Sequence, residues 1–130
     1  MGEHERIPEE IDEIAKFLAF FAATRTYRPL DKLSRPFSFG DIVSTIQEAL
    51  READVSYKNP SKTMKKKIEG REIELRYIED PRVGTIRVPR LPRPETVKRF
   101  YELCRENLYY AKMAAALALT YSPYLMERGE

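Results

Sequence analysis

The sequence of 130 residues contains one cysteine, one histidine and no tryptophan. A single cysteine, Cys104, excludes a disulfide within the chain, and one Cys with one His cannot build a metal site of those ligands. We expect Cys104 to be a small buried hydrophobe and His4, in a polar N-terminal stretch, to lie in solvent. No Ser or Cys therefore has a histidine to activate it as a nucleophile. These absences predict a protein that is not an enzyme and holds no metal or cofactor.

Glycine is also scarce, and Gly40, Gly70 and Gly84 are isolated, which excludes a glycine-rich phosphate loop. The N-terminal stretch is acidic where a secretory signal would be basic and then apolar. Together with the single cysteine, this predicts a cytoplasmic location. One glutamine and two asparagines, among abundant Lys, Arg and Glu, are typical of hyperthermophile proteins.

The net charge of +2 conceals an uneven distribution of charge along the chain. Residues 58–100 contain 13 Lys and Arg against 6 Asp and Glu, whereas the remainder contains 10 against 15. A basic middle segment in an otherwise acidic chain indicates a polyanionic partner.

Three stretches have the periodicity of helices, and we expect them at residues 8–24, 41–53 and 94–121. Ser38 or Asp41 is expected to cap the second. The third is expected to be one continuous helix of about 42 Å, with an alanine-rich end that lets a neighbouring helix approach closely.

In the first predicted helix, the segment after Lys16 is apolar on all sides. Phe17 and Phe20 therefore carry more apolar surface than one partner helix can cover. Either the other two predicted helices enclose these rings, or another protein does, and we include both residues among the candidates for subunit contacts.

The segment 24–40 is expected to be a loop that carries Arg25, Arg28 and Lys32 among aromatic residues. Cations can neutralise phosphates, and aromatic rings can stack on bases. An equally good interpretation is that the aromatic and leucine side chains fix the loop to the core, while the charges are merely solvated.

The pattern of the basic middle segment predicts a β-hairpin with a turn at Glu69-Gly70, followed by a third short strand and a proline-rich connection. Arg87, Arg90 and Arg93 recur at every third position among prolines, so a polyproline-like conformation would align them along one edge. Lys65 to Lys67 begin the hairpin, where they either bind phosphate or protect a sheet edge from association. The amount of basic charge in one segment favours phosphate binding.

These patterns predict a mainly α fold of the α+β class, a helical bundle in a single domain at 1–130. The helical body is expected at 7–55 and 94–122, and a small basic β insertion, a hairpin or three strands, at 58–93.

The stretch AATRTYRPLDKL at 22–33 and the helix ending AAALALTY resemble the small subunit of the archaeal type I-A CRISPR interference complex, a Cascade-like surveillance particle. With the first two helices, the resemblance covers about two-thirds of the chain, and the β segment matches least. It implies a non-catalytic subunit that stacks in several copies along the particle and supports the guide–target duplex and the displaced DNA strand. It transfers no individual contact residue.

We therefore predict a partner set of other subunits of the ribonucleoprotein, guide RNA, and single-stranded or target DNA, with self-association and no membrane. The predicted nucleic-acid-binding residues are Arg25, Arg28, Lys32, Lys65, Lys66, Lys67, Arg87, Arg90 and Arg93. The predicted protein-interface residues are Phe17, Phe20, Tyr109 and Tyr124. The alternative functions are a winged-helix-like DNA-binding transcriptional regulator and an assembly protein whose basic segment binds an acidic protein.

Overall fold

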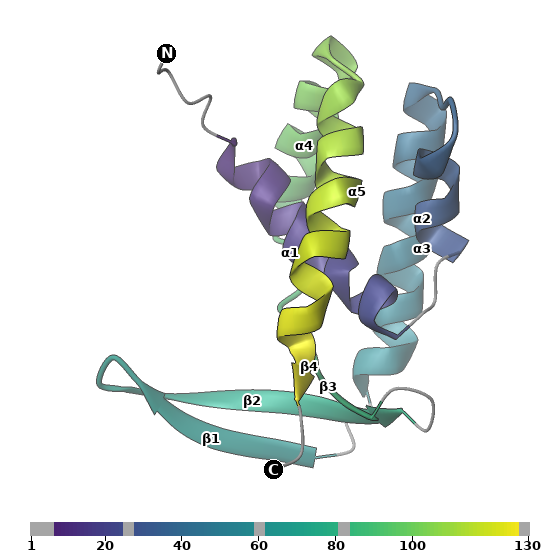
Figure 1. Cartoon of the computed structure of the whole chain (residues 1–130). Coiled ribbons are helices and arrows are strands. Elements are labelled where there is room, and N and C mark those ends of the chain that lie inside the picture. Colours follow the sequence, from purple (N-terminus) through teal and green to yellow (C-terminus); the bar gives the residue numbers. More distant parts are fainter. Residues whose placement is uncertain (1–6, 25–27, 59–61, 81–83, 128–130) are drawn as a thin grey trace.

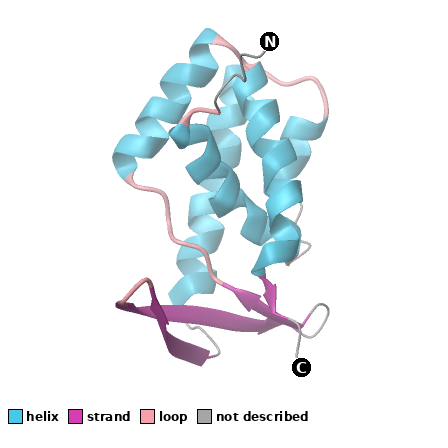
Figure 2. Ribbon diagram, turned by 60° about the vertical axis from the view of Figure 1, so that its left-hand side comes forward, coloured by secondary structure: helices cyan, strands magenta, loops and turns pink. Residues whose placement is uncertain are grey.

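The computed structural model describes residues 7–24, 28–58, 62–80 and 84–127. Its helices stand side by side, and an antiparallel sheet lies across one end of them (Figures 1 and 2). The predicted class, mainly α with a small β part, is confirmed. The helices are α1 (Glu9–Ala23), α2 (Arg28–Asp31), η1 (Lys32–Ser34), α3 (Phe39–Lys58), α4 (Pro94–Glu106), α5 (Tyr109–Tyr121) and η2 (Ser122–Leu125). The strands are β1 (Lys62–Ile68), β2 (Arg71–Asp80), β3 (Gly84–Arg87) and β4 (Met126–Glu127).

Helix α1 lies at the centre of the core and crosses behind α5 in the view of Figure 1. Helix α1 is in contact with α5, α4, η2 and α2, and its apolar C-terminal residues belong to the buried core. Phe17 is 0% exposed and Phe20 is 3% exposed, and both rings pack edge-to-face against Phe21. The prediction that Phe17 and Phe20 form a protein interface is therefore wrong, because the helices of the same chain cover both rings.

The prediction of one continuous helix over 94–121 is also wrong, since the chain breaks between α4 and α5 at Asn107. Asn107 has extended backbone angles (φ −153°, ψ 107°), and its side-chain oxygen accepts a hydrogen bond from the Tyr109 N–H at 3.0 Å. Asparagine competes with a helix through this kind of local bond. The break turns the chain back on itself, so that α4 and α5 form an antiparallel pair (Figure 1).

Helix α3 is longer than predicted, and its start is capped as expected by a reciprocal pair. The Asp41 N–H donates to Ser38 Oγ at 3.3 Å, and the Ser38 N–H donates to Asp41 Oδ2 at 2.9 Å. This pair is a capping box in which each side chain satisfies the other residue's backbone donor. The backbone hydrogen bond from Ser38 is the main reason that the pKa of Asp41 lies below its ordinary value.

The segment predicted as a loop contains α2 and η1, and Leu30 and Leu33 are buried in the core. These contacts support the interpretation in which hydrophobic side chains fix this segment to the body of the protein.

The hairpin of β1 and β2 turns at Glu69-Gly70, as predicted. Both turn residues have positive φ, 51° and 78°, which is the backbone geometry that two-residue hairpin turns favour. The predicted third strand is β3, which pairs with β2, whereas β4 was not predicted. The hairpin projects beyond the helices, with its turn farthest from them (Figure 1). No helix among the described residues is long and apolar enough to cross a membrane.

The close packing of α5 on α1 yields a stability prediction. Ala114 is fully buried, whereas Ala116 on the same helix is exposed. We expect Ala114→Leu to lower the free energy of unfolding by about 1–3 kcal/mol, because the larger side chain overfills the contact. Ala116→Leu is expected to change it by no more than about 0.5 kcal/mol. Denaturant unfolding of both variants measures the difference, and equal effects would contradict the arrangement of α5.

Candidate nucleic-acid interface

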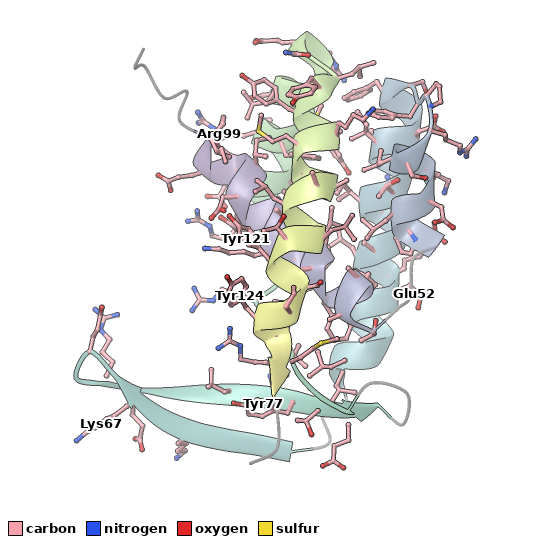
Figure 3. The ribbon with its side chains drawn as sticks, viewed as in Figure 1. Glu52, Lys67, Tyr77, Arg99, Tyr121 and Tyr124 are labelled. Atoms are coloured by element: carbon pink, nitrogen blue, oxygen red, sulfur yellow. The ribbon has the colours of Figure 1, made fainter. Side chains whose placement is uncertain are left out.

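A groove of about 880 Å³ opens between α1, the lower end of α5 and the segment that joins β3 to α4. Figure 3 shows Tyr121 and Tyr124 on this side of the C-terminal end of α5, with Tyr124 between the helices and β2. The lining residues are Glu9, Asp12, Glu13, Lys16, Ala19, Leu75, Arg87, Val88, Pro89, Arg90, Leu91, Arg93, Tyr121, Tyr124 and Leu125. The groove thus combines charged walls with an apolar and aromatic floor.

Arg87, Arg90 and Arg93, which the sequence predicted to lie along one edge, all line this groove. The start of the segment is held to the sheet, because the Val88 N–H donates to the Arg76 carbonyl oxygen at 2.8 Å. Pro89 and Pro92 then restrict its backbone. The arginines are therefore carried on a connection with limited freedom and form one wall of the groove.

The opposite wall is acidic and was not predicted, because acidic residues in a first helical turn already suit the helix dipole. Glu13 accepts a hydrogen bond from the backbone N–H of Arg93 at 3.3 Å and lies 3.6 Å from the Arg93 guanidinium. Asp12 forms an ion pair with Lys16 at 3.0 Å, and Glu10 forms one with Arg99 at 3.1 Å. Most of the acidic charge on α1 is therefore paired inside the protein.

Asp12 also accepts a hydrogen bond from the Tyr121 hydroxyl, which ties α1 to the end of α5. Burial disfavours the charged form of Asp12, but the hydrogen bonds from Tyr121 and Lys16 and the charge of Lys16 outweigh it, so the pKa of Asp12 is lowered. The same hydrogen bond is the main reason that the pKa of Tyr121 is raised. Both groups therefore hold the protonation states that this contact requires at neutral pH.

The pairing leaves two arginines available for a ligand. Among the described residues, Arg87 and Arg90 form no ion pair, whereas Arg93 is paired with Glu13. The lining contains four cations, at Lys16 and the three arginines, against three carboxylates. The positive charge that remains unbalanced is therefore concentrated at Arg87 and Arg90.

The predicted lysines of the hairpin lie apart from the groove. Lys65 and Lys67 are exposed on β1, and the register places their backbone opposite Glu74 and Glu72 on β2. Opposite charges at paired positions partly compensate one another. The side chain of Lys66 lies outside the described set. The hairpin is therefore less basic than its run of lysines suggests.

The cations of the N-terminal segment are not gathered at the groove either. Lys32 is partly buried, and its ammonium donates to Glu48 Oε1 at 3.1 Å and to Ser44 Oγ at 3.2 Å. It therefore joins η1 to α3 and is not a free cation. Arg25 lies outside the described residues, and of Arg28 only the backbone, at the start of α2, is described.

The two predicted interface tyrosines are exposed but lie far apart on the fold. Tyr109 is 60% exposed at the corner between α4 and α5, and Tyr124 is 76% exposed in η2. Only Tyr124 lines the groove. Cys104 is buried, and burial raises the pKa of its thiol to about 12. The part of the chain that is described contains no group of three or more His, Cys, Asp and Glu residues placed to hold a metal ion.

The contact between Asp12 and Tyr121 predicts a pH dependence of stability. Asp12 has a lowered pKa in the folded state, so its stabilising contribution is present above the ordinary value of 3.8 and is lost as the pH falls through the folded value. Tyr121→Phe is therefore expected to be less stable than the wild type at neutral pH. Its free energy of unfolding should also fall less between about pH 5 and about pH 2.

Denaturant unfolding at several pH values measures this effect, with Tyr124→Phe as the control, because it removes a tyrosine hydroxyl outside the contact. If the wild type and Tyr121→Phe lose the same stability on acidification, the hydrogen bond does not set the pKa of Asp12.

Comparison with known proteins identifies the family of the chain. A comparison with curated proteins gives no match. The comparison with protein families matches residues 17–121, from the buried part of α1 to the end of α5, to the family described as CRISPR-associated protein (Cas_Csa5). The match spans well over half of the chain, and the chain therefore belongs to this family of CRISPR-associated proteins.

Proposed function

We propose that this protein is the non-catalytic small subunit of a cytoplasmic type I-A CRISPR surveillance complex. In this role it contacts the sugar–phosphate backbones of guide RNA and target DNA and supports the displaced DNA strand. Membership of the CRISPR-associated family supports the proposal at the level of the system. The observation that carries it at the level of the molecule is the pair of arginines, Arg87 and Arg90, that line a groove without an ion-pair partner among the described residues.

The physical mechanism is electrostatic. Arginine side chains that neutralise phosphates release the counterions around the nucleic acid, and this contribution does not depend on base sequence. In RNA-guided complexes, pairing with the guide RNA supplies the sequence information, while the protein recognises shape and backbone. Two guanidinium groups without ion-pair partners suit this task, because each can form paired hydrogen bonds with a phosphate.

The hairpin offers a second, weaker contact. Lys65 and Lys67 are exposed on an arm that projects from the bundle (Figure 1), and Figure 3 shows Lys67 directed away from the helices. Such an arm reaches a strand that passes beside the helical body. Because the backbone register places these lysines opposite glutamate positions of β2, we assign the larger part of the binding to the groove.

The alternative of a winged-helix regulator is not favoured by the family match. A regulator of that kind would read bases with an exposed, basic helix face. The outward residues of α3 include Gln47, Arg51 and Glu52, which do not form such a face.

Self-association is part of the proposed role. Leu108 and Tyr109 are exposed at the corner between α4 and α5, and Leu119 is exposed farther along α5. Apolar side chains of this size suit contacts between neighbouring copies. Sedimentation at rising protein concentration tests this part, and a monomer at every concentration would contradict it.

The proposed role of the arginines predicts the effect of reversing their charge. We expect Arg87→Glu with Arg90→Glu to weaken binding to a single-stranded oligonucleotide at least about tenfold, because hydrogen bonds to charged groups are each worth roughly 1.5–3 kcal/mol. The slope of log affinity against log salt should become shallower by about 0.7 for each phosphate that the variant no longer neutralises. Fluorescence anisotropy across a salt series measures both quantities.

The control is Arg51→Glu with Lys112→Glu, which changes the net charge equally at exposed positions outside the groove. If both double variants lose the same affinity, binding reflects net charge alone. If neither loses affinity, the groove is not a nucleic-acid contact.

A further inference from the structure

We propose that the groove is a binding site for one unstacked nucleotide of a single strand. The base stacks on the ring of Tyr124, and the adjoining phosphates contact Arg87 and Arg90. This inference rests on the proposed function and specifies the ligand of the same site.

Tyr124 presents a ring that the rest of the protein leaves open. It is 76% exposed, and within the described part of the chain no aromatic ring or cation is stacked on it. Its backbone is nevertheless fixed, because η2 packs against α1 and the next residue, Leu125, is buried in the core. An exposed ring on a rigid support loses little conformational entropy when a base stacks on it.

The backbone that carries the cations for the phosphates is also held in place. Arg87 is paired in register with Tyr77 of β2, and Arg90 lies three residues later, directly after Pro89. Both line the same groove as Tyr124. A ring for the base and guanidinium groups for the backbone are the two elements that sequence-independent single-strand sites combine.

The acidic wall explains why the ligand is a single strand and not a duplex. A duplex carries phosphates on both of its sides, and the second set would approach Glu9 on α1, a carboxylate of the groove that forms no ion pair among the described residues. Like charges brought together at an interface disfavour that partner. A single strand can instead direct its phosphates to the arginines and its base to the ring of Tyr124, with no second set of phosphates near α1.

The size of the groove agrees with an occupant of this kind. A volume of about 880 Å³ lies in the range of sites that enclose one small molecule. A nucleotide within a duplex keeps its base stacked between its neighbours, so it cannot offer the base to Tyr124 without being unpaired. The groove therefore suits a displaced strand better than a guide–target duplex.

The test is photo-crosslinking of the full-length protein to a single-stranded oligonucleotide of about 12 nucleotides that carries 5-iodouracil. We expect mass spectrometry to locate the crosslink at Tyr124. Affinity for the same oligonucleotide should fall between about fivefold and about 150-fold in Tyr124→Ala, whereas Tyr124→Phe retains it. Ile7→Ala is the control, since Ile7 is also an exposed apolar side chain but lies outside the groove and outside the surface proposed for self-association. The affinity for a duplex of the same length should change little in Tyr124→Ala.

The outcomes separate this inference from the proposed function. One outcome is that the crosslink falls elsewhere and Tyr124→Ala binds like the wild type, while charge reversal at Arg87 and Arg90 weakens binding. In that case the nucleotide-binding site is wrong, and the contact of the arginines with the nucleic-acid backbone is retained. If reversal of the arginines also has no effect, both are wrong. If the occupant is an acidic protein segment, an acidic peptide should compete for the groove and no crosslink should form at Tyr124. That result would also contradict the nucleotide-binding site.

Discussion

The structure depends on the enclosure of α1. The half of this helix that follows Lys16 is apolar on every side, so it is stable in water only when other elements cover its whole circumference. One antiparallel pair of helices, α4 and α5, supplies much of that cover, and α2 and η2 supply more. The alanines of α5 let its backbone come close to α1, and the break at Asn107 turns α5 back so that this contact can form.

The groove is a consequence of the same arrangement. The C-terminal half of α1 is buried, whereas its polar N-terminal half lies at the surface. There it borders the connection from β3 to α4 and the end of α5. The contacts of Glu13 with Arg93 and of Asp12 with Tyr121 fasten these three elements together. They also neutralise charge that would otherwise repel or attract a ligand. Arg87 and Arg90 are the cations of the groove that form no ion pair among the described residues.

The protein presents less positive surface than the cations predicted from the sequence suggest. Lys32 is bonded within the helical body, and the hairpin lysines stand opposite glutamates. The groove therefore offers a polyanion the guanidinium groups of Arg87 and Arg90 and the exposed ring of Tyr124, and not a continuous basic surface. Such a site favours contact with a local backbone segment over tight general binding to nucleic acid.

The sequence by itself determined the first helix, the capping pair of Ser38 and Asp41, the hairpin turn at Glu69-Gly70 and the placement of Arg87, Arg90 and Arg93 among prolines. These features follow from local rules of periodicity, capping and backbone preference. Only the tertiary structure decided that Phe17 and Phe20 are core residues and that acids of α1 lie beside the arginines. The physical reason is that burial and ion pairing depend on which distant segments meet, and local residue patterns leave that choice open until the whole core is packed.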